Sequence, residues 1–253
     1  MGNCARLPLT VILSGAKDLT YEVCGSLHRE RDQVSLCGVP RLARNDDKNE
    51  RMNISAALLA GGQSRRMGRD KATILFRGKP LWQIELDLLH KLQPAEIFVS
   101  ARTDPAWRPP NLTFVPDEPP SRGPLSGLTA TLARIQSSHL LVLAIDMPFM
   151  NEDHLRYLCD KIEPGRGVLP MIGDRAEPLA AIYPVEARID FVNALSGVDF
   201  SMQTLTNQLV KIAKLRVIRV SEEEQRFYRN LNEPDDLDAR PGRRGDLGSL
   251  IAL

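Results

Sequence analysis

From residue 53 onward, the hydrophobic residues fall into two alternating patterns. Short continuous apolar runs are typical of buried strands, whereas apolar residues at helical spacing are typical of a helix with one buried face. The apolar runs predict strands over residues 54–59, 96–100, 112–115, 140–145, 168–171, 179–183 and 215–220. The helical spacing predicts helices over residues 80–92, 124–135, 153–162, 187–195 and 202–209. Strands separated by helices of this length indicate an α/β domain with a parallel sheet.

Two features of the sequence lie directly after predicted strands. A loop rich in glycine and basic residues, residues 59–71, begins where the first strand ends, and Asp146 follows the strand at 140–145. In parallel α/β sheets, ligands bind beyond the carboxyl ends of the strands, where the strand order switches. We therefore expect the loop and Asp146 to lie close together and to form one ligand site.

The loop has the composition of a polyphosphate-binding segment. Its glycines let the main chain approach phosphate oxygens, and successive backbone N–H groups form an anion-binding concavity. Arg66 and Lys71 add the charge that neutralises phosphates. A plain glycine-rich turn with surface charges is the alternative. The loop is neither a Walker A loop, because Gly-Lys-Ser/Thr is missing, nor a dinucleotide-binding fingerprint, because the glycine spacing differs.

Asp146 is the candidate metal ligand. A carboxylate at a strand end, beside a loop that holds phosphates, can bind Mg²⁺ through one oxygen while water and phosphates complete the octahedron. The alternative is a helix-capping aspartate ahead of Pro148. The four histidines share no ligand spacing, and the spacing of the four cysteines matches no zinc site. Asp146 is therefore the position at which the sequence predicts a metal.

Short motifs along the chain carry a family resemblance. They are Leu59-Ala60-Gly61-Gly62, Ser64, Arg66-Met67-Gly68, Asp70-Lys71, Pro116-Asp117, Gly123-Pro124-Leu125-Ser126-Gly127-Leu128, Asp146-Met147-Pro148-Phe149, Glu177-Pro178-Leu179 and Asn230-Leu231-Asn232. In this order and at these intervals, over about residues 53–238, the chain resembles the molybdenum cofactor nucleotidyltransferases, and most of all those that use GTP. Ordered motifs over most of the chain make this a specific match.

The resemblance implies a three-layer α/β/α Rossmann-like nucleotidyltransferase fold with a mostly parallel sheet. It implies transfer of GMP from GTP to molybdenum-molybdopterin, with release of pyrophosphate and with Mg²⁺ as cofactor. The implied catalytic residues are Lys71, Arg66 and Asp146, with Asp146 as metal ligand. The implied nucleotide contacts are Leu59, Ala60, Gly61, Lys71, Asp117 and Asp146, and the implied pterin contacts are Gly123, Pro124, Asn230 and Asn232. Molybdoenzymes, their chaperones and other cofactor-biosynthesis proteins are the implied protein partners.

Some assignments have simpler structural alternatives. Asp117 could belong to a turn, Gly123 to a helix start, and Asn230 to a capping motif before Pro234. Residues 100–103 read Ser-Ala-Arg-Thr, where relatives often carry an Asn that contacts the nucleotide. Transfer of CMP from CTP therefore stays open as an alternative, as does a non-catalytic nucleotide or cofactor carrier. The joint presence of a lysine and a carboxylate at the site disfavours the carrier.

Charge and composition limit the other partners and the compartment. A formal net charge of +1 argues against a general nucleic-acid partner and gives no reason to expect binding to an anionic membrane. No apolar run approaches the roughly 18 residues that a membrane-spanning helix needs. Four cysteines without a recognisable framework favour a reducing compartment, and we expect a cytoplasmic protein.

The first 51 residues differ from the rest of the chain. They have little sustained periodicity, they end in a charged run at 44–51, and Met52 stands just before the first strand. We expect residues 1–51 to be a non-native or disordered extension, residues 52–238 to be the enzyme domain, and residues 239–253 to be a flexible tail. The short apolar run at 7–13 faintly resembles a signal peptide, which leaves export as the alternative.

Overall fold

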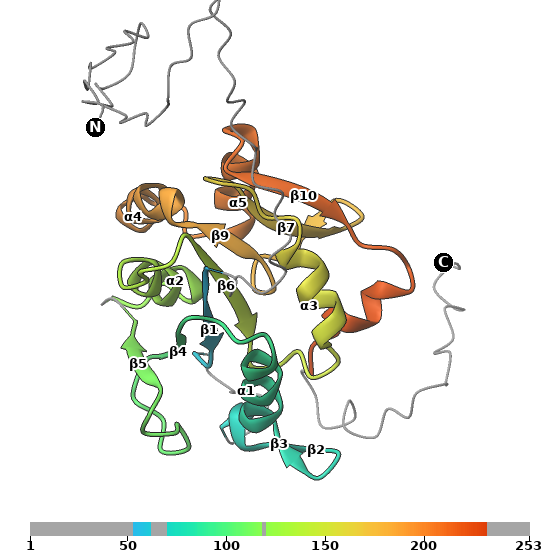
Figure 1. Cartoon of the computed structure of the whole chain (residues 1–253). Helices are drawn as coiled ribbons and strands as arrows, with labels where there is room; N and C mark the ends of the chain where they lie inside the picture. The colour runs from blue at the N-terminus through green and yellow to red at the C-terminus, as the bar shows by residue number, and fades with distance from the viewer. Residues whose placement is uncertain (1–52, 62–69, 118–119, 232–253) are drawn as a thin grey trace, which may run out of the picture. The chain divides into compact units, whose positions relative to one another are not determined.

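The computed structural model describes residues 53–61, 70–117 and 120–231 (Figure 1). The expected extension at 1–51 and tail at 239–253 lie outside the described residues, as does most of the glycine-rich loop. Among the described residues, no helix combines the length and the apolar character that a membrane span requires.

A central sheet organises the described part of the chain. Its strands lie in the order β10-β7-β9-β6-β1-β4-β5. In chain order their bounds are β1 (Ile54–Leu59), β4 (Ile97–Ala101), β5 (Thr113–Pro116), β6 (His139–Ala144), β7 (Gly167–Ile172), β9 (Ile182–Pro184) and β10 (Leu215–Arg219). A strand is present near each predicted position, but β9 begins three residues after its predicted start at 179, because Ala180 N donates to Glu177 O in a turn. The sheet is mostly parallel, and only β9 runs against its neighbours β6 and β7 along this path.

Helices cover both faces of this sheet, which confirms the three-layer α/β/α fold (Figure 1). The helices are α1 (Leu81–Lys91), α2 (Pro124–Leu132), α3 (Glu152–Cys159), α4 (Arg188–Ser196) and α5 (Met202–Lys211). Helices α1 and α3 pack on one face, and α2, α4 and α5 pack on the other. Helix α2 ends three residues before the predicted end at 135, and Ile135 N still donates to Thr131 O at 3.2 Å in the turn that follows.

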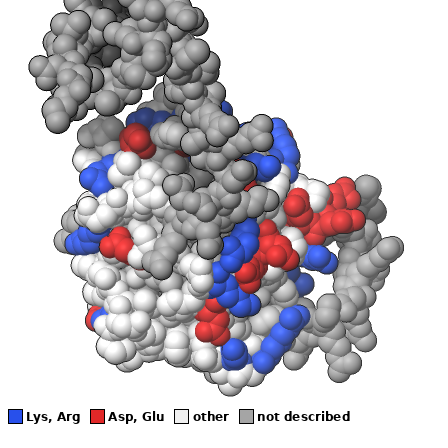
Figure 2. Space-filling view, in the orientation of Figure 1, with Lys and Arg blue, Asp and Glu red and all other residues white. Residues whose placement is uncertain are grey.

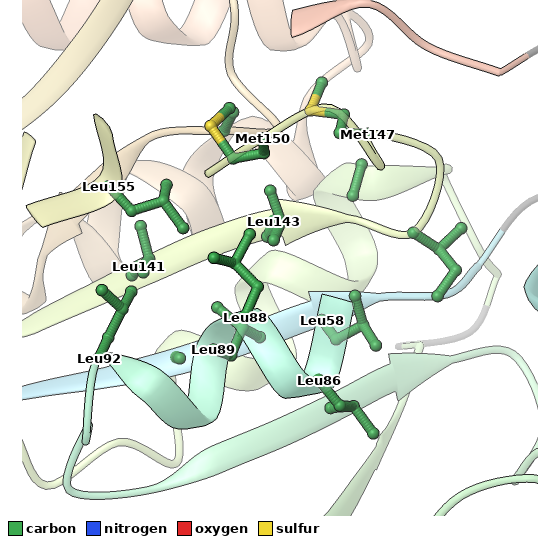
Figure 3. Close-up of a cluster of buried hydrophobic side chains, with 14 of the residues drawn as sticks. Leu58, Leu86, Leu88, Leu89, Leu92, Leu141, Leu143, Met147, Met150 and Leu155 are labelled. Atoms are coloured by element: carbon green, nitrogen blue, oxygen red, sulfur yellow. The ribbon is translucent and has the colours of Figure 1, made fainter. Parts of the chain in front are cut away.

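Alternation along the strands divides the core into two apolar layers. Ile54, Ala56 and Leu58 of β1 face α1 and α3, whereas Ala57 and Leu59 face α2. Figure 3 shows the first layer, in which the leucines of α1 meet those of β1 and β6. Because β1 is buried on both faces, its sequence is a continuous apolar run rather than an alternating one.

Several short elements were not predicted from the sequence. They are the two-residue strands β2 (Leu75–Phe76), β3 (Lys79–Pro80) and β8 (Arg175–Ala176) and the 3-10 helices η1 (Lys71–Thr73), η2 (Val185–Ala187) and η3 (Glu224–Tyr228). Segments this short carry no periodicity, so a hydrophobic pattern cannot reveal them. One of them, η1, holds Lys71 of the candidate site, and η3 ends two residues before Asn230.

The strand order switches between β1 and β6. From β1 the chain passes through α1 to β4 and then β5 on one side, and it returns through α2 to β6 on the other side. Leu59 is in register with Ser100 of β4 and with Ala144 of β6, so the carboxyl ends of these strands lie side by side. This is the position at which α/β sheets bind ligands.

Basic and acidic side chains are interspersed on the face shown in Figure 2. Charged side chains of the described residues also form ion pairs at the surface, such as Arg216 with Glu163 at 3.0 Å and Arg156 with Glu152 at 3.0 Å. Exposed pairs of this kind contribute little to stability, about 0–1 kcal/mol each. We therefore attribute the stability of the domain to its two apolar layers.

One buried polar side chain interrupts the apolar face of α1. Glu85 lies one helical turn from Leu81 and from Leu89, and it has no exposed surface. Neither of its carboxyl oxygens has a hydrogen-bond partner among the residues described. Burial, and to a smaller degree the negative charge of Asp146, raises the pKa of Glu85 well above its usual value. The folded state therefore holds this proton more tightly than the unfolded state does.

We expect Glu85→Leu to increase the free energy of unfolding at pH 7.5 by about 1–3 kcal/mol, because it removes an unsatisfied buried polar group. The gain should shrink as the pH falls toward about 4.3, since below that value glutamate is protonated in both states and the cost of protonating it on folding disappears. Urea denaturation between pH 5 and pH 8 measures both effects. Glu85→Gln is the control, with a smaller gain because its amide stays unsatisfied. A pH-independent gain for the leucine variant would contradict this account.

Candidate functional site

The main chain after β1 enters the site directly. Ala60 N donates to Ser100 O at 2.8 Å, and Ile145 N donates to Leu59 O at 3.0 Å. The Leu59 side chain is packed in the core, and its carbonyl is used by Ile145, whereas Gly61 is exposed. Of the predicted nucleotide contacts at 59–61, the backbone of Ala60 and Gly61 is therefore the part most open to a ligand.

The structure brings together two of the predicted catalytic residues, which lie 75 positions apart in the sequence. Lys71 Nζ donates to Asp146 Oδ2 at 2.8 Å. The two side chains are 17% and 20% exposed, so the pair is partly shielded from water and still open to a ligand. An ammonium and a carboxylate thus lie at the switch between β1 and β6, as the sequence predicts.

Lys71 is held in place by the residues around η1. Asp70 caps η1, because its Oδ1 accepts from Ala72 N at 3.0 Å. Its other oxygen, Oδ2, accepts from Trp107 Nε1 at 3.1 Å. The ring of Trp107 stacks on Trp82 of α1, with centroids 5.7 Å apart and planes inclined by 14°. The sequence motif singles out Asp70 next to Lys71, but nothing in the spacing connects it to Trp107.

Asp117 lies across β4 from the glycine that follows β1. A Cβ at Gly61 would lie 3.9 Å from both carboxylate oxygens of Asp117, so the carboxylate faces this glycine. Asp117 N donates to Ala101 O at 3.1 Å, and Ser121 Oγ donates to Asp117 Oδ2 at 2.7 Å. These contacts fix the carboxylate beside the backbone of Gly61, where the resemblance places the nucleotide.

Helix α2 packs closely behind Asp117 at a glycine. A Cβ at Gly127 would lie 2.4 Å from Ser100 Oγ and 3.0 Å from Asp117 Oδ1. Ser100 Oγ is buried and has no partner among the described residues. The predicted pterin contacts Gly123 and Pro124 begin this helix, with Gly123 at a φ of 69° and Pro124 at the first helical position. Both are exposed.

A third segment reaches the site from the end of the described chain. Leu231 N donates to Asp146 O at 2.9 Å, which brings Asn230 beside the aspartate. Asn230 Oδ1 is buried and has no hydrogen-bond partner among the described residues. The guanidinium of Arg229 lies 5.7 Å from the centre of the Phe149 ring. The unsatisfied amide oxygen of Asn230, one residue from this bond, is a group that a polar ligand would complete.

The structure thus gathers Gly61, Lys71, Asp117, Asp146 and Asn230 around the carboxyl ends of β1 and β6. Arg66 and Asn232 lie outside the described residues, so their predicted contacts stay predictions.

Comparison with known protein families identifies the family of the domain. The model of the MobA-like NTP transferase domain matches residues 56–212, which are more than half of the chain. The chain belongs to this family. Its MobA-like domain is an NTP transferase domain, and the matched residues include the strand-end positions Lys71, Asp117 and Asp146.

The match to two curated relatives extends over almost the whole length of each relative. A protein of Opitutus terrae named "Probable molybdenum cofactor guanylyltransferase" is 36% identical over 191 residues, 73% of this chain and 93% of its own. The "Molybdenum cofactor guanylyltransferase" of Syntrophotalea carbinolica is 31% identical over 189 residues, 73% of this chain and 89% of its own. The crystal structure of molybdopterin-guanine dinucleotide biosynthesis protein A from Archaeoglobus fulgidus matches with a TM-score of 0.60 and 25% identity, covering 73% of this chain and 95% of that one. This protein is therefore a nucleotidyltransferase of molybdenum cofactor biosynthesis.

Enzymes with a MobA-like domain typically use a divalent metal. Among the described residues, no group of three or more His, Cys, Asp and Glu side chains could hold a metal ion. Asp146 offers a single partly exposed carboxylate. One carboxylate suits Mg²⁺, which keeps several waters and is often bound mainly through the phosphates of a substrate. The donor set therefore fits a metal that arrives with a nucleotide.

Proposed function

We propose that this protein transfers GMP from GTP to molybdenum-molybdopterin, forming the molybdopterin guanine dinucleotide and releasing pyrophosphate. The observation that carries the proposal is the pair of Lys71 and Asp146, 2.8 Å apart at the strand-order switch of a MobA-like domain. The names of the relatives from Opitutus terrae and Syntrophotalea carbinolica support the choice of reaction.

In the proposed reaction the acceptor supplies its own nucleophile. An oxygen of the terminal phosphate of molybdopterin attacks the α-phosphorus of GTP, a new P–O bond forms, and the bond to the β-phosphate breaks. This oxygen is already anionic, so no protein general base is needed. Catalysis then depends on alignment of the two phosphates and on stabilisation of negative charge.

Each residue of the proposed site has its own part in this alignment and charge stabilisation. Lys71 neutralises charge on the triphosphate and on the leaving pyrophosphate, and the backbone at Ala60 and Gly61 approaches the nucleotide. Asp146 orients Lys71 and is the residue that would hold Mg²⁺, which neutralises phosphate charge when bound. Arg66 is proposed to assist Lys71. We also propose that the protein acts in the cytoplasm.

In the proposal, the guanine base of GTP and the molybdopterin acceptor bind on opposite sides of Asp146. Asp117, fixed beside Gly61, can accept from the neighbouring N1–H and amino groups of guanine, a pair of donors that cytosine does not offer. The unpartnered oxygen of Asn230 is proposed to contact the acceptor pterin, together with Asn232 and the backbone at Gly123 and Pro124. Asp117 is thus the residue that favours GTP over CTP.

A product assay with the full chain tests the proposal. The protein is incubated with Mg²⁺, molybdenum-molybdopterin and each nucleoside triphosphate in turn, and the product is identified by mass spectrometry. We expect the mass of the guanine dinucleotide with GTP and little product with the other nucleotides. A clear preference for CTP would overturn the choice of base, and ligand binding without any dinucleotide would overturn the enzyme assignment.

Gly127→Ala is expected to raise the KM for GTP by about tenfold. The added methyl would overlap Ser100 Oγ and press on Asp117 Oδ1, and overpacking of this kind costs about 1–3 kcal/mol. Because the atoms nearest to the added methyl belong to Ser100 and Asp117, the effect falls on the nucleotide side, and kcat should fall less than kcat/KM. Steady-state kinetics with varied GTP measures the effect.

A double variant supplies the control for this prediction. Ser100→Ala alone should leave the KM for GTP unchanged, because Ser100 Oγ has no partner among the described residues. Combined with Gly127→Ala, it removes the 2.4 Å overlap and should recover part of the lost affinity. If the double variant binds GTP no better than Gly127→Ala, the overlap with Ser100 is not the cause.

A further inference from the structure

A buried polar cluster joins α3 to the segment that leads into the site. His154 of α3 lies between Tyr228 and Glu224 of η3, and its side chain is 4% exposed. The distance from His154 Nε2 to Tyr228 Oη is 2.7 Å, and from His154 Nδ1 to Glu224 Oε1 it is 3.5 Å. These three side chains, called the α3–η3 cluster below, have no part in the proposed reaction.

The protonation states of the cluster follow from its surroundings. Burial lowers the pKa of His154, although the Glu224 carboxylate opposes this, so the imidazole is neutral at neutral pH. Burial raises the pKa of Tyr228, with further contributions from Glu224 and Glu177, so the phenol keeps its proton. Hydrogen bonds from Ser221 lower the pKa of Glu224, which is therefore a carboxylate.

These states fix the direction of the hydrogen bonds. The Glu224 carboxylate can only accept, so it favours the neutral His154 tautomer with the proton on Nδ1, and Nε2 then accepts from the Tyr228 O–H. Glu224 is itself held by Ser221, whose N and Oγ donate to Glu224 Oε2 at 2.9 and 2.8 Å. The cluster is thus a chain of donors with one orientation.

Aromatic packing holds the same groups in place. The imidazole of His154 lies 5.1 Å from the ring of Phe227 and 5.4 Å from the ring of Tyr228, centre to centre, and it is perpendicular to the second. Tyr228 is 5% exposed. The position of Tyr228 relative to α3 is therefore determined by both a buried hydrogen bond and ring contacts.

The chain runs from this cluster straight to Asp146. Two residues after Tyr228 comes Asn230, whose buried Oδ1 has no partner among the described residues. One residue later, Leu231 N donates to Asp146 O at 2.9 Å. Asn230 therefore lies between two fixed points, the Tyr228 hydroxyl on one side and the Asp146 carbonyl on the other.

We propose that His154 is a positioning residue for the acceptor substrate, because it holds Tyr228 and thereby fixes the Asn230 amide beside Asp146. This inference rests on the proposed function in one respect, that Asn230 contacts the pterin acceptor. The triphosphate side is built from other segments, with Gly61 after β1, Lys71 in η1 and Asp117 after β5. Loss of the cluster should therefore weaken binding of the acceptor and leave binding of GTP intact.

The test compares His154→Leu, His154→Gln and Tyr228→Phe in the full chain, with separate KM values for GTP and for molybdenum-molybdopterin. We expect about a tenfold higher KM for the acceptor in His154→Leu and Tyr228→Phe, and a KM for GTP within twofold of the wild type. His154→Gln should recover part of the loss, because its amide oxygen can still accept from Tyr228. The double variant His154→Leu/Tyr228→Phe should have the same KM for the acceptor as either single variant, because each substitution removes the same hydrogen bond.

Tyr157→Phe is the matched control. Tyr157 also lies on α3 and its ring is 6.2 Å from that of His154, but it is 41% exposed and no hydrogen bond joins it to the imidazole. This variant should keep both KM values. Thermal unfolding identifies variants that fail to fold, and Tyr228→Phe, which loses one oxygen atom, keeps the test available if His154→Leu is one of them.

Hydrogen exchange provides a readout that needs no turnover. Faster exchange at residues 229–231 in His154→Leu, with unchanged exchange at 54–61, is the expected result. Equal changes in both KM values, or an unchanged KM for the acceptor together with unchanged exchange, would overturn the role of His154. Failure of the proposed function looks different, because the wild type itself would then form no guanine dinucleotide.

Discussion

Lys71→Met should lower kcat for guanylyl transfer by about 10²–10³-fold, the usual loss when one preorganised charge-stabilising group is removed. Methionine keeps the length and packing of the side chain but removes the ammonium that lies 2.8 Å from Asp146 at the mouth of the site. A lysine about 4 Å from a phosphate contributes roughly 4 kcal/mol at an effective dielectric constant near 20. Only the part of this interaction that grows in the transition state accelerates the reaction, so kcat should fall more than affinity for GTP.

Rates of pyrophosphate release and of dinucleotide formation measure this effect. Lys79→Met is the matched control, because Lys79 carries the same charge on a nearby strand but is exposed and pairs with Asp87 at 3.0 Å. It should retain the wild-type kcat. A Lys71→Met enzyme whose kcat stays within a few-fold of the wild type would exclude Lys71 from the catalytic step.

Asp146→Asn is expected to reduce kcat by at least about 10²-fold, and its residual activity should need more Mg²⁺. Asparagine keeps the shape of the side chain and an oxygen for Lys71, but it removes the negative charge that pairs with Lys71 and that would hold the metal. The main-chain bond from Leu231 N to Asp146 O does not depend on the side chain, so the fold around the site should persist. Activity measured against Mg²⁺ concentration separates the metal role from simple loss of charge.

Two further variants make the Asp146 prediction specific. Asp153→Asn removes a carboxylate from the exposed first turn of α3 and should change neither kcat nor the Mg²⁺ requirement. In the double variant Lys71→Met/Asp146→Asn, the losses should not add, because the two side chains are in contact. An Asp146→Asn enzyme with an unchanged Mg²⁺ requirement would contradict the metal role.

The fold was most predictable from the sequence where a long strand is buried on both faces. The run at 54–59 lies within the sheet with every residue buried, and the sequence indicates both its type and its bounds. The reversed direction of β9 could not be predicted, because pairing with β6 and β7 depends on contacts between distant segments. The two-residue strands were missed because they have no period.

The candidate site was predictable to the extent that it follows from strand ends. Lys71 and Asp146 were expected to meet because both follow strands at a switch in strand order, and they do. The supports of these residues were not predictable. Trp107, in a loop, donates to Asp70, and His154 is hydrogen-bonded to Tyr228, 74 positions away in the sequence. Neither contact follows from the hydrophobic periodicity or from a motif. Asn230 was singled out by the family motif alone.

The stacked tryptophans beside the site have a practical consequence. The chain contains only two tryptophans, Trp82 and Trp107, and the indole N–H of Trp107 donates to the aspartate that precedes Lys71. Indole emission responds to the polarity and hydrogen bonding of the ring. The whole intrinsic tryptophan signal therefore comes from two stacked rings, one of which is hydrogen-bonded to the residue next to Lys71, and we expect nucleotide binding to change this signal without any attached label.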